Sequence, residues 1–329
     1  MVLGGLLSGL AWTTQFSDPL AWLVIATFLI AAVLEYIDRR EQARAVAVAG
    51  WVTFALFWFS LIYHFAVVQR SIIEGIGSVL AVPLAVYVGY LLWQGRDSLF
   101  VLSRAIVVMG AIFFPLESVT ALNRPLVETV TRQTEFLIGL TGHDPAVVNG
   151  AELSHRDVDH YRNTFVFVTD LPYTETVEEH TITYTILVAC TGLGSMAVFA
   201  GLIAAVEAPV GRKLRALAVS LPVIYVLNLF RNVFIAVTFG KQYLHLFPDA
   251  VLTLFASEEV PKVSYYVGDR IVSQSLSVVA LVAVTYLVVR ELPEILTIVE
   301  DLLFVVTGSE WDLVDALDTT PVRADGGER

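Results

Sequence analysis

Long apolar runs alternate with short polar segments along most of this chain. Each run approaches or exceeds the roughly 20 residues that an α-helix needs to cross a bilayer, and charged residues are rare within them. Seven membrane spans are predicted in this way: Leu20–Ile37, Ala45–Val68, Ile76–Trp93, Ala105–Leu122, Thr185–Val206, Leu214–Phe239 and Ile271–Val289. The opening segment, Val2–Trp12, is too short to span alone; we expect it at the membrane interface, with an eighth transmembrane helix as the alternative.

A polar insert from Asn123 to Thr183 separates the fourth span from the fifth. Within it, residues 163–169 and 181–186 alternate with a period of two and are rich in β-branched and aromatic side chains. This pattern is typical of short strands, and the intervening Asp170, Leu171 and Pro172 favour a turn. We therefore predict an all-α polytopic membrane protein that carries one small extracytoplasmic β-hairpin.

The distribution of basic residues predicts the orientation of the spans. Short loops rich in arginine and lysine alternate with a loop whose basic residue is Arg70, and such basic loops face the cytoplasm. The basic loop residues are Arg39, Arg40, Arg44, Arg96, Arg104, Arg212, Lys213 and Arg215. The N-terminus is then outside and the C-terminus inside a cell membrane. Four parts follow: helices in 1–122, an extracytoplasmic insert in 123–184, helices in 185–289 and an acidic cytoplasmic tail in 290–329.

Charge and composition narrow the class of protein. The chain has 32 acidic and 20 basic residues, a net charge of −12, and 56% of its residues are hydrophobic. An acidic excess keeps a protein solvated in a salt-rich cytoplasm, which indicates a halophile, and it argues against nucleic acid as a partner. The single cysteine excludes a disulfide within the chain.

Cys190 is that cysteine, and it lies near the start of the fifth predicted span. A lone cysteine in a membrane helix is most often a small packing residue. Here, however, the strand pattern just before it implies that a helix starts nearby, and a helix N-terminus stabilises a thiolate. Thr191 and Gly192 follow directly, and the small residues around the sulfur leave it accessible to a substrate. We therefore consider Cys190 a candidate nucleophile.

Arg231 lies inside the apolar stretch Leu214–Phe239. A guanidinium in hydrocarbon is costly, so it indicates either a functional site or a buried ion pair. The stretch contains no Asp or Glu, and Glu117 is the nearest intramembrane acid that the sequence suggests as a partner. Asn228, three residues earlier, shares a helical face with Arg231 and is expected to hold the guanidinium in place.

Arg270 stands at the outer end of the last predicted span. Taken alone, it is explained by snorkelling to the interface, with Tyr265 and Tyr266 as part of an aromatic belt. On the predicted topology, however, it faces the same leaflet as Cys190 and Arg231.

The histidines carry less information. His155 and His160, with Asp157 and Asp159, lie in an acidic loop and lack a closed set of metal ligands, so we expect a solvated surface and neither a metal nor a cofactor. His180 and His245 are interpreted as surface residues, with a proton relay as the alternative.

Three short motifs in successive segments make the chain recognisable. Ala189-Cys190-Thr191-Gly192, Asn228-Leu229-Phe230-Arg231-Asn232 and Gly268-Asp269-Arg270 resemble the exosortase/archaeosortase family, and most closely its haloarchaeal branch. The resemblance implies a membrane-embedded cysteine transpeptidase with Cys190 as nucleophile, Arg231 as catalytic arginine and Arg270 as third member. Residues 185–289 would then hold the catalytic helices. Exosortases commonly place a histidine third, so Arg270 agrees with the archaeosortase branch alone.

The family also implies the partners. They are surface proteins, such as S-layer glycoprotein, whose C-terminal sorting signal combines a Pro-Gly-Phe motif, a transmembrane helix and a basic cluster. A thioester intermediate would pass the protein to a membrane lipid, while hydrolysis by water stays open. Because arginine remains protonated, neither Arg231 nor Arg270 is a credible general base, and stabilisation of a thiolate or an oxyanion is the expected role.

Two alternatives come from other classes of protein. In a transporter or channel, Arg231 would bind an anion within the membrane, although the chain lacks the repeated halves common in transporters. A non-enzymatic assembly factor for surface proteins is the other. Thiol chemistry requires Cys190, whereas neither alternative does.

Overall fold

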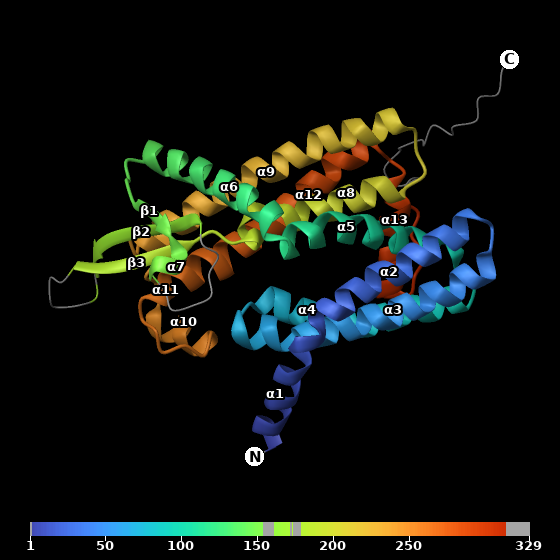
Figure 1. The fold of residues 1–329 in the computed structure, drawn as a ribbon, viewed down its shortest axis with the longest axis horizontal. Helices are drawn as coiled ribbons and strands as arrows, with labels where there is room; N and C mark the ends of the chain where they lie inside the picture. Colours follow the sequence, from blue (N-terminus) through green and yellow to red (C-terminus); the bar gives the residue numbers. More distant parts are fainter. Residues whose placement is uncertain (1, 154–160, 172, 174–178, 314–329) are drawn as a thin grey trace. The chain divides into compact units, whose positions relative to one another are not determined.

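The computed structural model describes residues 2–153, 161–171, 173 and 179–313, which are mostly helical with one small sheet (Figure 1). His155, Asp157, Asp159 and His160 lie outside the described residues. The chain divides into two compact units. The first unit comprises residues 1–112, 197–220 and 285–329, and the second comprises residues 113–196 and 221–284.

Six helical stretches in the described chain are long and apolar enough to cross a membrane: Leu7–Tyr36, Arg40–Val68, Ile72–Trp93, Asp97–Ser118, Val210–Gly240 and Lys262–Glu291. Each contains most of one predicted span. The first incorporates part of the opening segment, because a 3₁₀ turn at Thr14–Phe16 continues α1 into α2. The predicted fold class, a polytopic helical membrane protein, is confirmed.

The fifth predicted span begins later than expected. Strand β3 runs through Thr185, and helix α8 covers only Leu193–Ala205, which is 13 residues. At about 1.5 Å per residue such a helix is about 20 Å long, short of a bilayer core of about 30 Å. The apolar composition was correctly interpreted, but the boundary at Thr185 was wrong, since residues 185–192 form a strand end and a turn.

The helices of the first unit pack closely where glycines allow it. Its main helices are α1 (Val2–Thr13), α2 (Ser17–Tyr36), α3 (Arg40–Tyr63), α4 (Ile72–Trp93), most of α5 (Phe100–Ser118) and α13 (Ile295–Thr307). Helix α3 packs against both α2 and α4 (Figure 1). A Cβ on Gly50 would lie 2.6 Å from the Phe28 ring, and one on Gly89 would lie 3.2 Å from Trp51 Cβ. These glycines therefore set the close helix approach.

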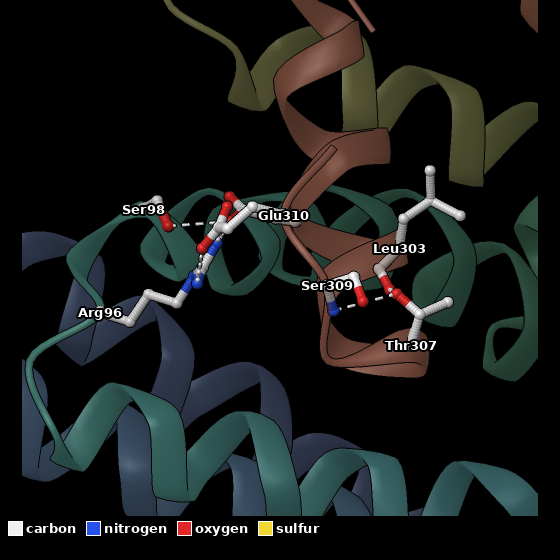
Figure 2. A network of polar contacts seen from close by, with 7 residues as sticks. Arg96, Ser98, Leu303, Thr307, Ser309 and Glu310 are labelled. Carbon is white, nitrogen blue, oxygen red and sulfur yellow. Dashed lines mark hydrogen bonds and ion pairs between the residues drawn. The ribbon is translucent and has the colours of Figure 1, made fainter. Parts of the chain in front are cut away.

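A polar network joins the start of α5 to α13 within the first unit (Figure 2). The buried Asp301 carboxylate accepts hydrogen bonds from Arg96 at 3.2 and 3.3 Å and from the Ser98 hydroxyl at 3.0 Å. Arg96 also contacts Glu310 at 2.9 Å and lies 3.7 Å above the Phe304 ring. The helical tail segment is thus part of this unit rather than a free extension.

The second unit carries a three-stranded antiparallel sheet in the order β1-β2-β3. Its strands are β1 (Ala146–Asn149), β2 (Arg162–Asp170) and β3 (Glu179–Thr185). The predicted hairpin is confirmed as β2 and β3, which pair from Thr164 with Thr185 to Asp170 with Glu179. Strand β1 is an addition that the sequence analysis did not predict.

Helix α6 (Thr120–Leu140) occupies the first part of the insert and was not predicted from the sequence. Its buried side chains include Val127, Val130, Thr134 and Ile138, which recur at helical spacing on one face. That face contacts β2 and the turn at Val188–Thr191. The amphipathic period was present in the sequence, but the many polar residues of the segment hid it from a search for apolar spans.

The unit also contains α7 (Gly150–Leu153), α10 (Pro248–Leu254), α11 (Lys262–Tyr265), a π-helical segment at Tyr266–Ser273, and parts of α9 (Val210–Gly240) and α12 (Gln274–Glu291).

Candidate active site

Cys190 lies in a 3₁₀ turn, Val188–Thr191, that links β3 to α8. The Thr191 hydroxyl donates to the Val188 carbonyl at 2.6 Å and accepts from the Leu193 amide at 3.3 Å, so it closes the turn and caps α8. Gly192 follows with φ +78°, a conformation that favours glycine. The expectation that a helix starts close after Cys190 is confirmed, and the thiol is presented on a turn rather than inside a helix.

Two asparagines of α9 hold the backbone of this turn. The side-chain amides of Asn228 and Asn232 donate hydrogen bonds of 2.7 and 2.8 Å to the carbonyl oxygen of Cys190. They are four residues apart and so lie on one helical face. The expected role of Asn228 was wrong: its amide holds the backbone carbonyl of Cys190 and not the Arg231 guanidinium. Double donation to one carbonyl fixes the position of Cys190 relative to α9.

Arg231 is paired with a carboxylate that the sequence analysis did not assign. Its Nη2 lies 2.6 Å from Oδ1 of Asp269, whose side chain is 6% exposed. The expectation that Glu117 was the nearest partner is therefore wrong. The ion pair lowers the cost of holding the guanidinium away from water. It also leaves the other donors of Arg231 available, because a guanidinium carries five N–H groups.

Arg270 meets the same carboxylate from the other side. Its Nε lies 3.5 Å from Oδ2 of Asp269, and its guanidinium lies 5.7 Å from the centre of the Tyr265 ring. Its side chain is 11% exposed, less than the 27% of Arg231. The surrounding side chains therefore cover Arg270 more fully than Arg231. The π-helical turn of Tyr266–Ser273 widens the local helix, and both Asp269 and Arg270 lie within it.

Tyr184 is a further residue of the site that the sequence analysis missed. It lies on β3 opposite Phe165, is 7% exposed, and its hydroxyl forms a hydrogen bond with the Cys190 side chain. Burial raises the pKa of the Tyr184 phenol well above its ordinary value, so the hydroxyl stays protonated and can donate. The strand pattern identified the segment, but only the sheet register shows which face Tyr184 occupies.

The charges around Cys190 act in opposite directions. Burial and the Asp269 carboxylate disfavour a thiolate, whereas a hydrogen bond with the Leu187 backbone, the Arg231 guanidinium and the Tyr184 hydroxyl favour it. Formation of a thiolate at Cys190 therefore depends on these three neighbours.

A cavity of about 330 Å³ adjoins the cluster within the second unit. Its lining comes from α9, α12, the π-helical segment and the start of α8, and it is mostly apolar. Asn228 and Arg231 contribute polar groups to it, and Ser273 and Ser277 line its α12 side. Such a cavity can accept an apolar segment next to the guanidinium.

The two histidines considered earlier have contacts elsewhere. His245 stacks on Tyr173 with ring centres 4.0 Å apart, and burial lowers its pKa. His180 lies in β3 opposite Thr169. The interpretation as surface residues, and the alternative of a proton relay, both stay predictions.

Fold and site together define a multi-pass membrane protein with one cysteine beside a cluster of arginine, aspartate and tyrosine. A family model described as transmembrane exosortase matches residues 12–258. Archaeosortase A of Haloferax volcanii is 50% identical over 311 residues, covering 92% of this chain and 97% of that protein. Archaeosortase A of Natronomonas pharaonis is 38% identical over 315 residues, covering 93% and 95%. No solved structure matches the chain. The chain belongs to the transmembrane exosortase family, and is thus a membrane-embedded protein-processing enzyme.

Proposed function

We propose that this chain is a cysteine transpeptidase that removes a C-terminal sorting signal from surface proteins and attaches the remaining protein to a membrane lipid. The signal would combine a Pro-Gly-Phe motif, a transmembrane helix and a basic cluster. Cys190 is the nucleophile, and Arg231 and Arg270 are the catalytic arginines. The reaction site faces the exterior, as the basic loops predict.

One observation carries this proposal: the turn that bears Cys190 is anchored while its sulfur meets the Tyr184 hydroxyl and lies in the field of Arg231. Asn228 and Asn232 fix the carbonyl of Cys190. The Tyr184 hydroxyl donates to the sulfur, and the Arg231–Asp269 pair acts on its charge. A merely structural cysteine needs none of these contacts, whereas a nucleophile needs a fixed position and stabilisation of its thiolate.

The first half of the reaction forms a thioester. The Cys190 thiolate attacks the carbonyl carbon of the scissile peptide bond, and the carbonyl electrons move to oxygen. Collapse of this oxyanion breaks the C–N bond, and the proton that the thiol released ends on the leaving amine. Arg231 or Arg270 donates hydrogen bonds to the oxyanion, because charge develops there in the transition state. The freed amine carries the signal helix away.

The second half releases the protein from the enzyme. A nucleophilic group of a membrane lipid attacks the thioester carbon, its proton passes to the departing sulfur, and the Cys190 thiol is restored. Water in place of the lipid would give a hydrolysed product instead. The cavity beside Arg231 supports this scheme, since it gives apolar groups access to the site from the membrane helices.

The alternative of an anion transporter or channel gains little support from the geometry. An anion site at Arg231 would not explain why two asparagines fix the Cys190 carbonyl or why the Tyr184 hydroxyl lies beside its sulfur. Those contacts favour the enzyme.

The decisive experiment follows a surface protein with a C-terminal signal helix in cells that carry the wild type or Cys190→Ala. We expect removal of the helix by the wild type and full retention with the variant, while both proteins insert in the membrane to equal levels. Complete processing by a stably inserted Cys190→Ala variant would contradict the nucleophile assignment. If the processed protein carries no lipid, the second step is hydrolysis by water and not transfer to a lipid.

A further inference from the structure

Asp269 contacts both arginines that the proposed reaction uses. Its Oδ1 lies 2.6 Å from Nη2 of Arg231, and its Oδ2 lies 3.5 Å from Nε of Arg270. The residue is only 4% exposed, and the Tyr265 hydroxyl also forms a hydrogen bond with it. A buried carboxylate is costly unless it is paired, so its contacts with two cations are a specific arrangement.

We propose that Asp269 is a positioning residue, which orients Arg231 and Arg270 and leaves the cluster with the single positive charge that a thiolate or an oxyanion would neutralise. This inference rests on the proposed function. The hydrogen bond of Arg231 and the ion pair of Arg270 use separate oxygens of one carboxylate, which holds the two guanidinium groups in a fixed relation to each other. The remaining donors of each can then be directed towards the sulfur and the scissile carbonyl.

The charge balance gives the second part of the argument. Two arginines and one aspartate carry a net charge of +1. Ionisation of Cys190, or formation of the oxyanion that follows attack, brings this cluster to neutrality. A neutral cluster is favoured where the dielectric constant is low. Without the Asp269 charge, the cluster would keep an excess positive charge throughout the reaction, so the thiolate would be held more tightly and would attack less readily.

The charged and titratable groups that interact with Cys190 come from four elements. Tyr184 belongs to β3, Arg231 to α9, Tyr265 to α11, and Asp269 to the π-helical segment. Among these, Asp269 is the one that opposes the thiolate by its charge. Its removal should therefore make the thiolate form at lower pH. A residue that merely supports the fold would not produce this shift.

Alkylation of the protein measures the thiolate directly, because Cys190 is the only cysteine in the chain. The full-length protein in membranes would be treated with iodoacetamide over a pH series, and processing of a signal-bearing substrate would be measured in parallel. For Asp269→Asn we expect the pH of half-maximal alkylation to fall by about one unit. We expect processing to fall by about tenfold or more, since the arginines lose their shared anchor.

Two further variants keep the test decisive. Asp269→Glu retains the charge but displaces the carboxylate, so alkylation should follow the wild-type pH profile while processing falls several-fold. Asp301→Asn removes another buried aspartate that pairs with an arginine, in the first unit, and should leave the alkylation profile unchanged. If Asp269→Asn does not accumulate in the membrane, the Asp269→Glu profile decides, and a shift in it overturns the proposal.

An unshifted profile in an inserted Asp269→Asn variant also overturns the proposal, whatever happens to processing. Failure of the proposed function has a different signature. In that case Cys190→Ala would still process the substrate. The alkylation profiles of the wild type and the Asp269 variants do not depend on processing, so they would test the role of Asp269 separately.

Discussion

A Cβ atom on Gly192 would lie 3.0 Å from Cγ of Asn228, the residue that holds the Cys190 carbonyl. Gly192 also has φ +78°, which a residue with a side chain adopts at a cost of about 1–3 kcal/mol. The glycine therefore serves both the backbone conformation of the turn and the close approach of α9. The sequence identified Gly192 as leaving space near the sulfur; the neighbour that uses this space is Asn228.

Gly192→Ala should consequently reduce processing strongly, by about tenfold or more, because displacement of Asn228 releases the carbonyl of Cys190. The measurement is the fraction of substrate that loses its signal helix. Gly142→Ala is the matched control: its φ is +81°, but an added Cβ would meet no atom within 4 Å. It should carry a similar backbone strain with near-normal processing. Equal loss in both variants would show that strain, and not the contact with Asn228, determines activity.

The two arginines should respond differently to lysine. Arg231 makes the 2.6 Å contact with Asp269, whereas the Arg270 contact is 3.5 Å. Lysine lacks the planar fork of arginine, so the shorter, more directional contact loses more on substitution. Arg231→Lys should therefore process at least several-fold less substrate than Arg270→Lys. The same processing assay checks this, with membrane levels of both variants matched; a milder effect at Arg231 would reverse their roles.

The proposed orientation can be tested with single cysteines in a Cys190→Ser background. Val168 in β2 is 51% exposed, and Gly211 near the start of α9 is exposed with open space for a side chain. The basic-loop pattern places the first outside and the second inside. An impermeant maleimide should label Val168→Cys in intact cells and Gly211→Cys only after lysis. The opposite labelling would put the reaction site on the cytoplasmic side.

The sequence predicted the spans because each depends on its own composition. Twenty apolar residues specify a membrane helix without reference to the rest of the fold, and the alternation in residues 163–169 specified β2 in the same local way. The boundary at Thr185 failed because composition alone does not show where a strand ends and a helix begins. Helix α6 was missed since its apolar face is diluted by polar residues.

The site was predictable only in part. Arg231 stands out in its apolar stretch and Cys190 is the only cysteine in the sequence, whereas Arg270 became a candidate through its position and the family resemblance; all three lie in the second unit. Asp269 was visible beside Arg270, yet its pairing with Arg231 depends on the course of the π-helical segment, which no local pattern encoded. Tyr184 depends on the sheet register. Contacts between residues that are distant in the sequence can be identified only once the fold is known.

The network around Asp301 should contribute to stability without affecting chemistry. Asp301 is buried and accepts three hydrogen bonds from Arg96 and Ser98. Its replacement by alanine leaves Arg96 without that partner and should lower the free energy of unfolding by about 3 kcal/mol. Glu310→Gln is the control, because that side chain is 74% exposed and its ion pair should contribute less than about 1 kcal/mol. Denaturant titration in detergent measures both; equal effects would contradict this account.

A larger side chain in the cavity beside Arg231 should block the substrate. Ser277 lines it from α12, and its hydroxyl is bonded within the helix, to the Ser273 carbonyl at 2.7 Å. Ser277→Trp should fill much of the 330 Å³ and exclude the substrate. We expect processing to fall by about tenfold or more, while alkylation of Cys190 by the small reagent iodoacetamide continues. Val279→Trp is the matched control: Val279 is on the same helix and 64% exposed, but it does not line the cavity. Normal processing by Ser277→Trp would mean that the substrate reaches Cys190 by another route, and loss of both processing and alkylation would indicate a distorted site instead of a filled one.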